Sequence, residues 1–239
     1  MLNCYGGDNV ATYAFSDLHG YLNIYHQIKK YVKPEDKLFC LGDCGDRGPD
    51  PWDTIKAVLT DPQITYLKGN HEDMLVKATR EVMDGSYGCE TQRLLAMNGG
   101  TETLEELLGE ESPERWMKEL SQLPTIIKLE NKKGQKIALS HAGYSAWKDD
   151  DEVIPPNKDL IWERLHHFDS AKLLSDIIIV HGHTSIKHIA MDLGILAPYG
   201  ALEYADGKKY CIDAGTHRSH RSILFDLDTF ESKVFRVKD

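Results

Sequence analysis

Polar residues that can bind metals and phosphate follow several short apolar runs of this 239-residue chain. The densest group, 42–48, follows the apolar run 38–41 and sets the carboxylates of Asp43 and Asp46 beside the guanidinium of Arg47. A carboxylate can bind a metal ion, an arginine can bind phosphate, and glycines let the backbone approach both. The loop therefore indicates a site for a metal and an anionic group.

Four other apolar runs also end at potential metal ligands. These are Asp17 with His19, Asn70 with His71, His141, and His181 with His183. Ligand sites in open α/β sheets form at the carboxyl ends of parallel strands, so these side chains are expected to meet. Oxygen and imidazole ligands without thiolate suit manganese, iron, zinc or a similar metal, and a carboxylate between two ions would make a two-metal centre.

Each group taken alone also has a purely structural explanation. Asp17 could cap the following helix, and Asp46 could pair with Arg47 inside a tight turn. Asn70 could occupy a left-handed turn position, and the histidines could be ordinary buried or loop side chains. Because all these explanations would have to hold in five loops at once, a shared site is favoured. For His181 a packing role beside the site is favoured over a ligand role, and His166 and His167 are expected on a solvated helix face.

The elements expected around these groups begin with a βαβαβ unit of parallel strands. Its strands are predicted at 10–15, 37–41 and 64–67, and its helices at 22–32 and 51–59. Within a single domain spanning 1–239, residues 72–123 are predicted to form a helical insert over the sheet, with helices at 74–83, 102–107 and 113–120. Later strands are predicted at 126–129 and 137–140, joined as a hairpin, and at 177–180, 210–213, 223–227 and 234–237.

The composition is that of a soluble globular protein, with 41% hydrophobic and 28% charged residues. The net charge of −10 argues against nucleic acid or an anionic membrane as a partner, although a bound metal can still attract a small anion. The five cysteines form no CxxC pair, which favours reduced thiols. With neither a signal peptide at 1–9 nor a membrane-spanning run, a cytoplasmic location is expected.

The groups together resemble the signature of the calcineurin-like metallophosphoesterases, and more narrowly that of the compact bacterial phosphoprotein phosphatases. The matching segments are DLHG from Asp17, GDCGDRG from Gly42, GNHE from Gly69, HAG from His141 and GHT from Gly182, supported by 98–100, 160–164 and 212–215. Ser16 stands where the family usually has glycine, and Ser185 where many non-phosphatase relatives have another metal histidine. The resemblance implies an α/β fold, with a β-sandwich flanked by helices around the βαβαβ core.

The resemblance also implies a role for each matched residue. Asp17 and His19 would bind a first metal, Asp43 would bridge both metals, and Asn70, His141 and His183 would bind the second. Arg47, Asn70 and Arg164 would hold the substrate phosphate, while His71 would protonate the leaving oxygen with Asp46 orienting its ring. The expected cofactor is a pair of divalent ions, first of all manganese, with iron, zinc, nickel, cobalt and magnesium as the other choices.

The expected function is hydrolysis of phosphoserine or phosphothreonine in proteins by a hydroxide held between the two metals. The substrate would be a phosphoprotein or a phosphorylated small molecule. One alternative is hydrolysis of diadenosine tetraphosphate, because such enzymes share these motifs. A second alternative is a non-catalytic binding module of the same fold, against which the presence of His71, Asp46 and Arg47 argues.

Overall fold

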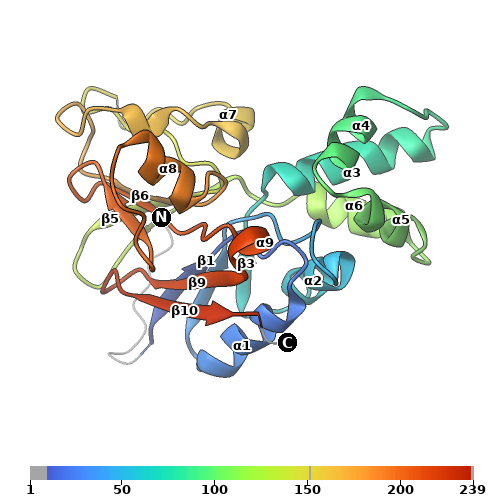
Figure 1. The fold of residues 1–239 in the computed structure, drawn as a ribbon, viewed down its shortest axis with the longest axis horizontal. Coiled ribbons are helices and arrows are strands. Elements are labelled where there is room, and N and C mark those ends of the chain that lie inside the picture. The colour runs from blue at the N-terminus through green and yellow to red at the C-terminus, as the bar shows by residue number, and fades with distance from the viewer. Residues whose placement is uncertain (1–9, 151, 238–239) are drawn as a thin grey trace.

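The computed structural model describes residues 10–150 and 152–237, and it contains two five-stranded sheets with helices outside them (Figure 1). The first sheet has the order β10-β9-β1-β2-β3. Its strands are β1 (Thr12–Phe15), β2 (Lys37–Cys40), β3 (Ile64–Tyr66), β9 (Arg221–Asp226) and β10 (Ser232–Arg236), and the helices α1 (Leu22–Tyr31) and α2 (Pro51–Leu59) connect the first three. Because β1 pairs with β2 and β2 with β3 in parallel, the predicted βαβαβ unit is confirmed.

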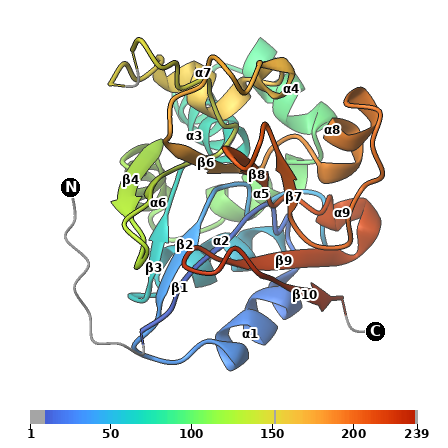
Figure 2. The same cartoon turned by 90° about the vertical axis from the view of Figure 1, so that its left-hand side faces the viewer.

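The second sheet has the order β4-β5-β6-β8-β7. Its strands are β4 (Ile126–Glu130), β5 (Lys136–Ser140), β6 (Ile178–His181), β7 (Leu202–Tyr204) and β8 (Lys209–Cys211). The predicted hairpin is present as the antiparallel pair β4 and β5, whereas the three-residue β7 was too short to be recognised. Figure 2 shows α1 outside the first sheet and α7 (Asn157–Trp162) and α8 (Ile186–Asp192) beyond the second.

The main core lies between the two sheets, because alternate strand residues point to opposite faces. Ala14 of β1 and Phe39 of β2 pack in one buried cluster with Leu139 and Val180 of the second sheet. Their chain neighbours, among them Phe15, point the other way into a cluster under the helices. The strands are therefore fixed in register by burial on both faces, and their carboxyl ends are held at one edge.

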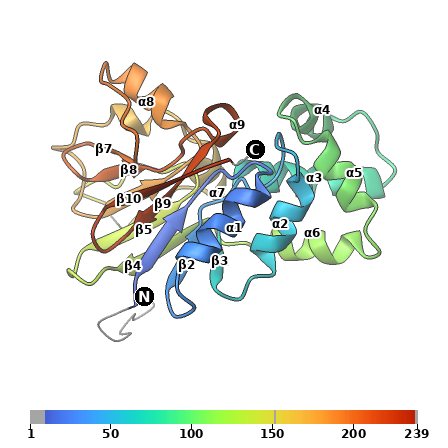
Figure 3. The same cartoon turned by 60° about the horizontal axis from the view of Figure 1, so that its bottom comes forward.

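The helical insert stands beside the sheets, so the prediction that it lies over them is wrong (Figure 3). Its helices are α3 (Asn70–Met83), α4 (Glu90–Met97), α5 (Thr101–Leu108) and α6 (Pro113–Ser121). Leu95, Leu107 and Leu120 pack into the cluster that also contains Trp52 and Ile55 of α2, which explains the sideways position. Leu95 is the buried residue of α4, so that helix offered too weak an apolar pattern to predict.

Several sequence expectations concern short or terminal segments. His166 and His167 lie in a 3-10 helix (His166–Phe168) and are 3% and 4% exposed, so the prediction that they face solvent is wrong. Cys40, Cys44, Cys89 and Cys211 are free thiols, whereas Cys4 and the segment 1–9, where no signal peptide was expected, lie outside the described residues. No helix in the described ranges is both long and apolar enough to cross a membrane.

Candidate active site

Five loops that follow β1, β2, β3, β5 and β6 bring the predicted site residues together. Hydrogen bonds between backbones join these loops: the Asp17 amide donates to the Gly42 carbonyl at 3.0 Å, and the His19 amide donates to the Asp43 carbonyl at 3.0 Å. Eight of the predicted site residues are buried, namely Asp17, His19, Asp43, Asp46, Asn70, His71, His141 and His183. The expectation that these groups meet at one edge of the sheets is therefore met by the geometry.

One set of ligand atoms surrounds Nε2 of His141. This nitrogen lies 3.0 Å from Oδ1 of Asn70, 3.2 Å from Oδ2 of Asp43 and 3.2 Å from Nδ1 of His183. Nδ1 of His141 faces the carbonyl oxygen of Leu41 at 2.8 Å, which assigns the ring proton to Nδ1 and leaves Nε2 as a lone-pair donor. Asp43, His141 and His183 thus form a compact group whose atoms fit a divalent cation.

A second set of ligand atoms shares Asp43 with the first. His19, Asp43 and His71 offer atoms within 4.8 Å of one another, and Asp17 Oδ1 lies 3.9 Å from Nε2 of His19. Nδ1 of His19 faces the Gly45 carbonyl at 3.1 Å, so the lone pair is again on Nε2. The structure therefore puts Asp17 next to His19 as expected, and it also brings His71 within reach of the same centre.

Buried negative charge gives the site its need for cations. Burial, with the Asp213 carboxylate next in importance, raises the pKa of Asp17 well above its usual value. Burial also lowers the pKa of His141, but the nearby Asp43 carboxylate outweighs it and raises that pKa to about 9. A proton or a metal ion at this place would stabilise the same set of carboxylates. Asp213 belongs to the matching segment 212–215, and the sequence did not indicate its effect on the pKa of Asp17.

The imidazoles of His19 and His183 are held neutral, as metal ligands must be. Burial lowers the pKa of His19, and the nearby His71 and Arg47 lower it further. Burial also lowers the pKa of His183, helped by His141 and Arg164. His183 Nε2 is buried and has no hydrogen-bond partner among the described residues, so one ring nitrogen remains unsatisfied in a charged pocket. The residues present therefore fit a pair of divalent ions.

Arg47 lies between the imidazoles of His19 and His71. Its Nη1 is 2.7 Å from Nε2 of His19, and its Nη2 is 2.9 Å from Nε2 of His71. On its other side, Nδ1 of His71 contacts Oδ2 of Asp46. Burial lowers the pKa of His71, but Asp43 and Asp46 outweigh it, so the pKa is raised. The predicted phosphate arginine, proton donor and orienting carboxylate are thus in direct contact.

Strained backbone marks the same loops. Asp17, His19, Asp43, Asp46, Arg47 and His183 all have positive φ angles, from 46° to 68°. Such angles are uncommon for residues with a β-carbon and persist where the surrounding structure holds them. The fold thus holds the candidate ligands in conformations that a free loop would rarely adopt.

Glu72 accepts hydrogen bonds from the loop that follows β2 and holds it in place. Its position in the GNHE segment did not indicate this role. Its carboxylate accepts hydrogen bonds from the amides of Asp43, Cys44 and Gly69 at 2.8–2.9 Å and from the Tyr66 hydroxyl at 2.7 Å. Its position at the third residue of α3 was the one signal that could have indicated this. Glu72 therefore holds the backbone that carries Asp43.

Arg164 approaches the site from the segment after α7. Its Nη1 donates to the Thr184 hydroxyl at 3.2 Å, directly beside His183. His181 instead pairs its Nε2 with the Tyr204 hydroxyl at 2.7 Å and its Nδ1 with the Gly182 carbonyl at 2.9 Å. Both nitrogens of His181 are thereby engaged, which agrees with the packing role expected for it.

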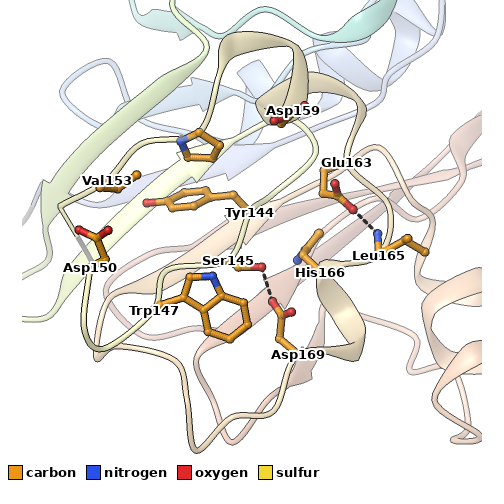
Figure 4. Close-up of a pocket in the computed structure, with 11 residues that line it drawn as sticks. Tyr144, Ser145, Trp147, Asp150, Val153, Asp159, Glu163, Leu165, His166 and Asp169 are labelled. Carbon is orange, nitrogen blue, oxygen red and sulfur yellow. Dashed lines mark hydrogen bonds between the residues drawn. The ribbon is translucent and has the colours of Figure 1, made fainter.

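A separate pocket of about 460 Å³ flanks the Arg164 segment (Figure 4). Its lining includes Tyr144 and Trp147 together with the acidic residues Asp150, Asp159 and Glu163, and it contains no lysine or arginine. Glu163 and Leu165 are the immediate neighbours of Arg164 in the chain. This pocket was not predictable from the sequence, because its lining residues come from several separate turns.

Comparison with known proteins gives both a sequence relative and structural relatives. No family model matches the chain. Serine/threonine-protein phosphatase 2 of Escherichia coli (strain K12) is 31% identical over 134 residues, which cover 54% of this chain and 56% of that protein. The match thus spans little more than half the length of this curated relative.

Solved structures agree over nearly the whole chain. A candidate diadenosine tetraphosphatase superposes with a TM-score of 0.64 at 15% identity, covering 98% of this chain and 96% of that one. A metallophosphoesterase from Sphaerobacter thermophilus gives 0.57 at 17% identity, with 96% and 88% covered. A cold-active protein tyrosine phosphatase gives 0.59 at 17% identity, with 95% and 77% covered.

These likenesses rest on the fold at low identity and on a sequence match over 54% of the chain. They agree with the α/β sandwich and with the family that the motifs indicated. The chain therefore has the fold of these solved phosphoesterase structures, among them a metallophosphoesterase.

Proposed function

We propose that this chain is a metal-dependent phosphomonoesterase that hydrolyses phosphoserine and phosphothreonine in proteins. The observation that carries the proposal is the pair of ligand groups that share Asp43 and lie directly beside Arg47 and His71. A buried carboxylate common to two cation sites, next to a guanidinium, is suited to a phosphate bridging those cations.

Metal binding in this proposal is divided between the two groups. Asp17, His19 and Asp43 would hold one divalent ion, and Asp43, Asn70, His141 and His183 the other, with manganese as the first choice. When bound, the ions would supply Lewis-acid stabilisation of the phosphate oxygens and acidify a water molecule at neutral pH. Asp17 and His19 are held for this role by the hydrogen bonds that their backbone amides make to the β2 loop.

The chain's own residues supply the remaining parts of hydrolysis. Arg47 and Arg164 would bind the phosphate oxygens from two sides, and the Asn70 amide would add a further donor. A water molecule would form the new bond to phosphorus and lose a proton to solvent as the bond from phosphorus to the ester oxygen breaks, and His71 would give its Nε2 proton to that oxygen. Asp46, in contact with Nδ1 of His71, would keep the ring oriented for this transfer.

The acidic pocket beside Arg164 supports a peptide rather than a polyphosphate as substrate. Asp150, Asp159 and Glu163 would repel the chain of phosphates of a dinucleotide and attract basic side chains next to a phosphorylated residue. Trp147 and Tyr144 add aromatic faces suited to cations. The sequence match to a serine/threonine-protein phosphatase points in the same direction.

Diadenosine tetraphosphate hydrolysis is the second candidate, and it is favoured by the near-complete structural overlap with a candidate diadenosine tetraphosphatase. The two functions are separated by one panel, in which purified protein with Mn²⁺ is given phosphoserine, phosphothreonine and phosphotyrosine peptides and diadenosine tetraphosphate. Release of inorganic phosphate from the first two peptides, with little nucleotide product, is expected. Fast release of ADP from the dinucleotide without peptide turnover would overturn the proposed specificity.

A binding module without catalysis is the remaining alternative. Metal content of the purified protein distinguishes it, because a binding module need not keep two ligand groups intact. About two equivalents of divalent metal, removed by chelator together with activity and restored by Mn²⁺, are expected. Protein that binds no metal and hydrolyses none of the four compounds would refute the enzyme.

A further inference from the structure

Thr103 of the helical insert is hydrogen-bonded to the carboxylate that contacts the candidate proton donor. It lies in the first turn of α5 and is 0% exposed. Its hydroxyl donates to Oδ1 of Asp46 at 2.5 Å, while Oδ2 of the same carboxylate contacts Nδ1 of His71. The two oxygens of Asp46 are thus held by residues that lie 57 and 25 positions away in the chain.

The residues just before Thr103 grip the same stretch of backbone. The Gly99 carbonyl accepts from the Arg47 amide at 3.1 Å, and the Asn98 carbonyl accepts from Nε of Arg47 at 3.2 Å. A β-carbon on Gly100 would lie 2.8 Å from Oδ2 of Asp46, so this glycine is needed for the close approach. Segment 98–103 therefore contacts both the carboxylate and the arginine of the candidate active site.

Asp46 and Arg47 need such support because both have left-handed backbone angles, with φ of 66° and 68°. Strained conformations persist only where contacts from outside the loop hold them. The β2 loop receives support from Glu72 on one side and from segment 98–103 on the other. The insert therefore supplies direct contacts to Asp46 and Arg47 of the candidate site.

We propose that Thr103 is a positioning residue, which sets the orientation of Asp46 and through it the imidazole of His71. Without the hydroxyl, Oδ1 of Asp46 would remain buried with no donor from α5, and the carboxylate would turn to satisfy it. The imidazole that it contacts would then lose its alignment toward the leaving oxygen. This inference rests on the proposed function, in which His71 protonates the leaving group.

Two substitutions at one position separate the hydroxyl from the side-chain volume. Thr103→Val keeps the branched shape without the hydroxyl, whereas Thr103→Ser keeps the hydroxyl. Thr79→Val is the matched control, because Thr79 is also a 0% exposed threonine of the insert, but its hydroxyl donates only to the Leu75 carbonyl of its own helix. Metal content and thermal unfolding are measured for all three variants.

The kinetic readout compares a poor with a good leaving group. We expect Thr103→Val to lower kcat on a phosphoserine peptide by about tenfold, a part of the full general-acid contribution, with KM and metal content unchanged. Turnover of p-nitrophenyl phosphate, whose leaving group needs little protonation, should fall much less. Thr103→Ser should retain wild-type turnover, and so should Thr79→Val. Equal losses on both substrates, or wild-type rates in Thr103→Val, would overturn the positioning role.

A spectroscopic readout keeps this test independent of catalysis. In protein labelled with ¹⁵N-histidine, the Nδ1 proton of His71 should give a hydrogen-bonded low-field signal, assigned by its loss in His71→Asn. Thr103→Val should shift this signal, and Thr103→Ser and Thr79→Val should leave it in place. An unshifted signal in Thr103→Val would contradict the inference. If the signal shifts in Thr103→Val as expected but the wild-type protein has no phosphatase activity, only the proposed function is refuted.

Discussion

Oδ2 of Asp43 lies 3.2 Å from Nε2 of His141 and 3.8 Å from Nε2 of His71. Asp43 is 2% exposed, and its other oxygen accepts the His71 amide at 3.0 Å. Burial raises the pKa of Asp43, but the imidazoles of His141 and His71 outweigh it and keep the pKa well below the usual value. One ionised carboxylate therefore belongs to both candidate metal groups.

Replacing Asp43 with Asn should weaken both metals together. The change removes the negative charge common to the two groups, so Mn²⁺ affinity at each should fall by more than the roughly 10–100-fold typical of residues behind the ligands. Metal analysis and Mn²⁺ titration by calorimetry measure this. Asp53→Asn on the exposed face of α2 is the control and should bind metal normally. Loss of a single metal with the other intact would contradict the shared role.

Replacing His71 with Asn should lower turnover and leave metal binding intact. His71 contacts Asp46 and Arg47, but it also lies within reach of His19 and Asp43, so its role as proton donor competes with a role as ligand. We expect kcat on a phosphoserine peptide to fall about 10²–10⁴-fold with two metals still bound. Metal content and single-turnover rates decide the matter, since a ligand role would show as metal loss.

The strands and the five ligand loops were predictable because their signals are local. Each apolar run is short, and each is followed directly by its polar group, so a parallel order of strands was enough to bring Asp17, Asp43, Asn70, His141 and His183 together. The βαβαβ pattern predicted the parallel pairing of β1, β2 and β3 only, and it did not predict the order of the second sheet, whose loops hold His141 and His183. The pattern of apolar runs indicated that the polar groups meet, and the family motifs indicated which of them bind metal.

The contacts that support these loops were not predictable, because their partners are distant in the chain. Thr103 reaches Asp46 across 57 residues, and nothing in the pattern of α5 marks its hydroxyl. His166 appeared solvent-facing, yet its backbone carbonyl and ring accept from the buried ammonium of Lys209 across 43 residues. The insert lies beside the sheets because its leucines pack against α2. This packing depends on surfaces that exist only in the folded protein, so the sequence pattern did not predict it.

Removing the Lys209 ammonium should destabilise the fold. Its side chain is 0% exposed, and Nζ donates to the Asp169 carboxylate and the His166 carbonyl at 2.7 Å each. Lys209→Met leaves that carboxylate without its cation, and loss of one member of a buried pair costs about 3–5 kcal/mol. Urea unfolding measures the change. Lys208→Met, next in the chain and paired with the fully exposed Asp176, should have little effect.

A comparable loss in both lysine variants would indicate that the 208–209 backbone, and not the buried ammonium, is sensitive to substitution. Lys209→Arg gives a second comparison, because it keeps the charge but enlarges the head group in a closed space. We expect it to recover part of the stability and not all of it. This ordering, with Met lowest, follows from the carboxylate of Asp169 and could not arise from lost packing alone.

The unfolding free energy should fall on acidification below about pH 6.5, the ordinary pKa of histidine. Burial, reinforced by the charges of Lys209 and His141, outweighs the hydrogen bond to the Gly182 carbonyl and lowers the pKa of His181 to about 3. Burial together with His181 and Lys209 lowers the pKa of His166. These rings stay neutral in the folded state while the unfolded state binds their protons. Stability is thus complete above pH 6.5 and is lost toward pH 3, by up to about 1.4 kcal/mol per pH unit for each ring.

Urea unfolding between pH 4 and 7, in the presence of chelator, tests this dependence without a contribution from bound metal. His181→Asn removes one titrating ring, so the slope of unfolding free energy against pH should decrease by up to about 1.4 kcal/mol per pH unit, whatever the variant's overall stability. His26→Asn, which replaces an exposed histidine of α1, is the control for the substitution itself. An unaltered slope in His181→Asn would show that the ring in contact with Tyr204 accepts its proton within the folded protein.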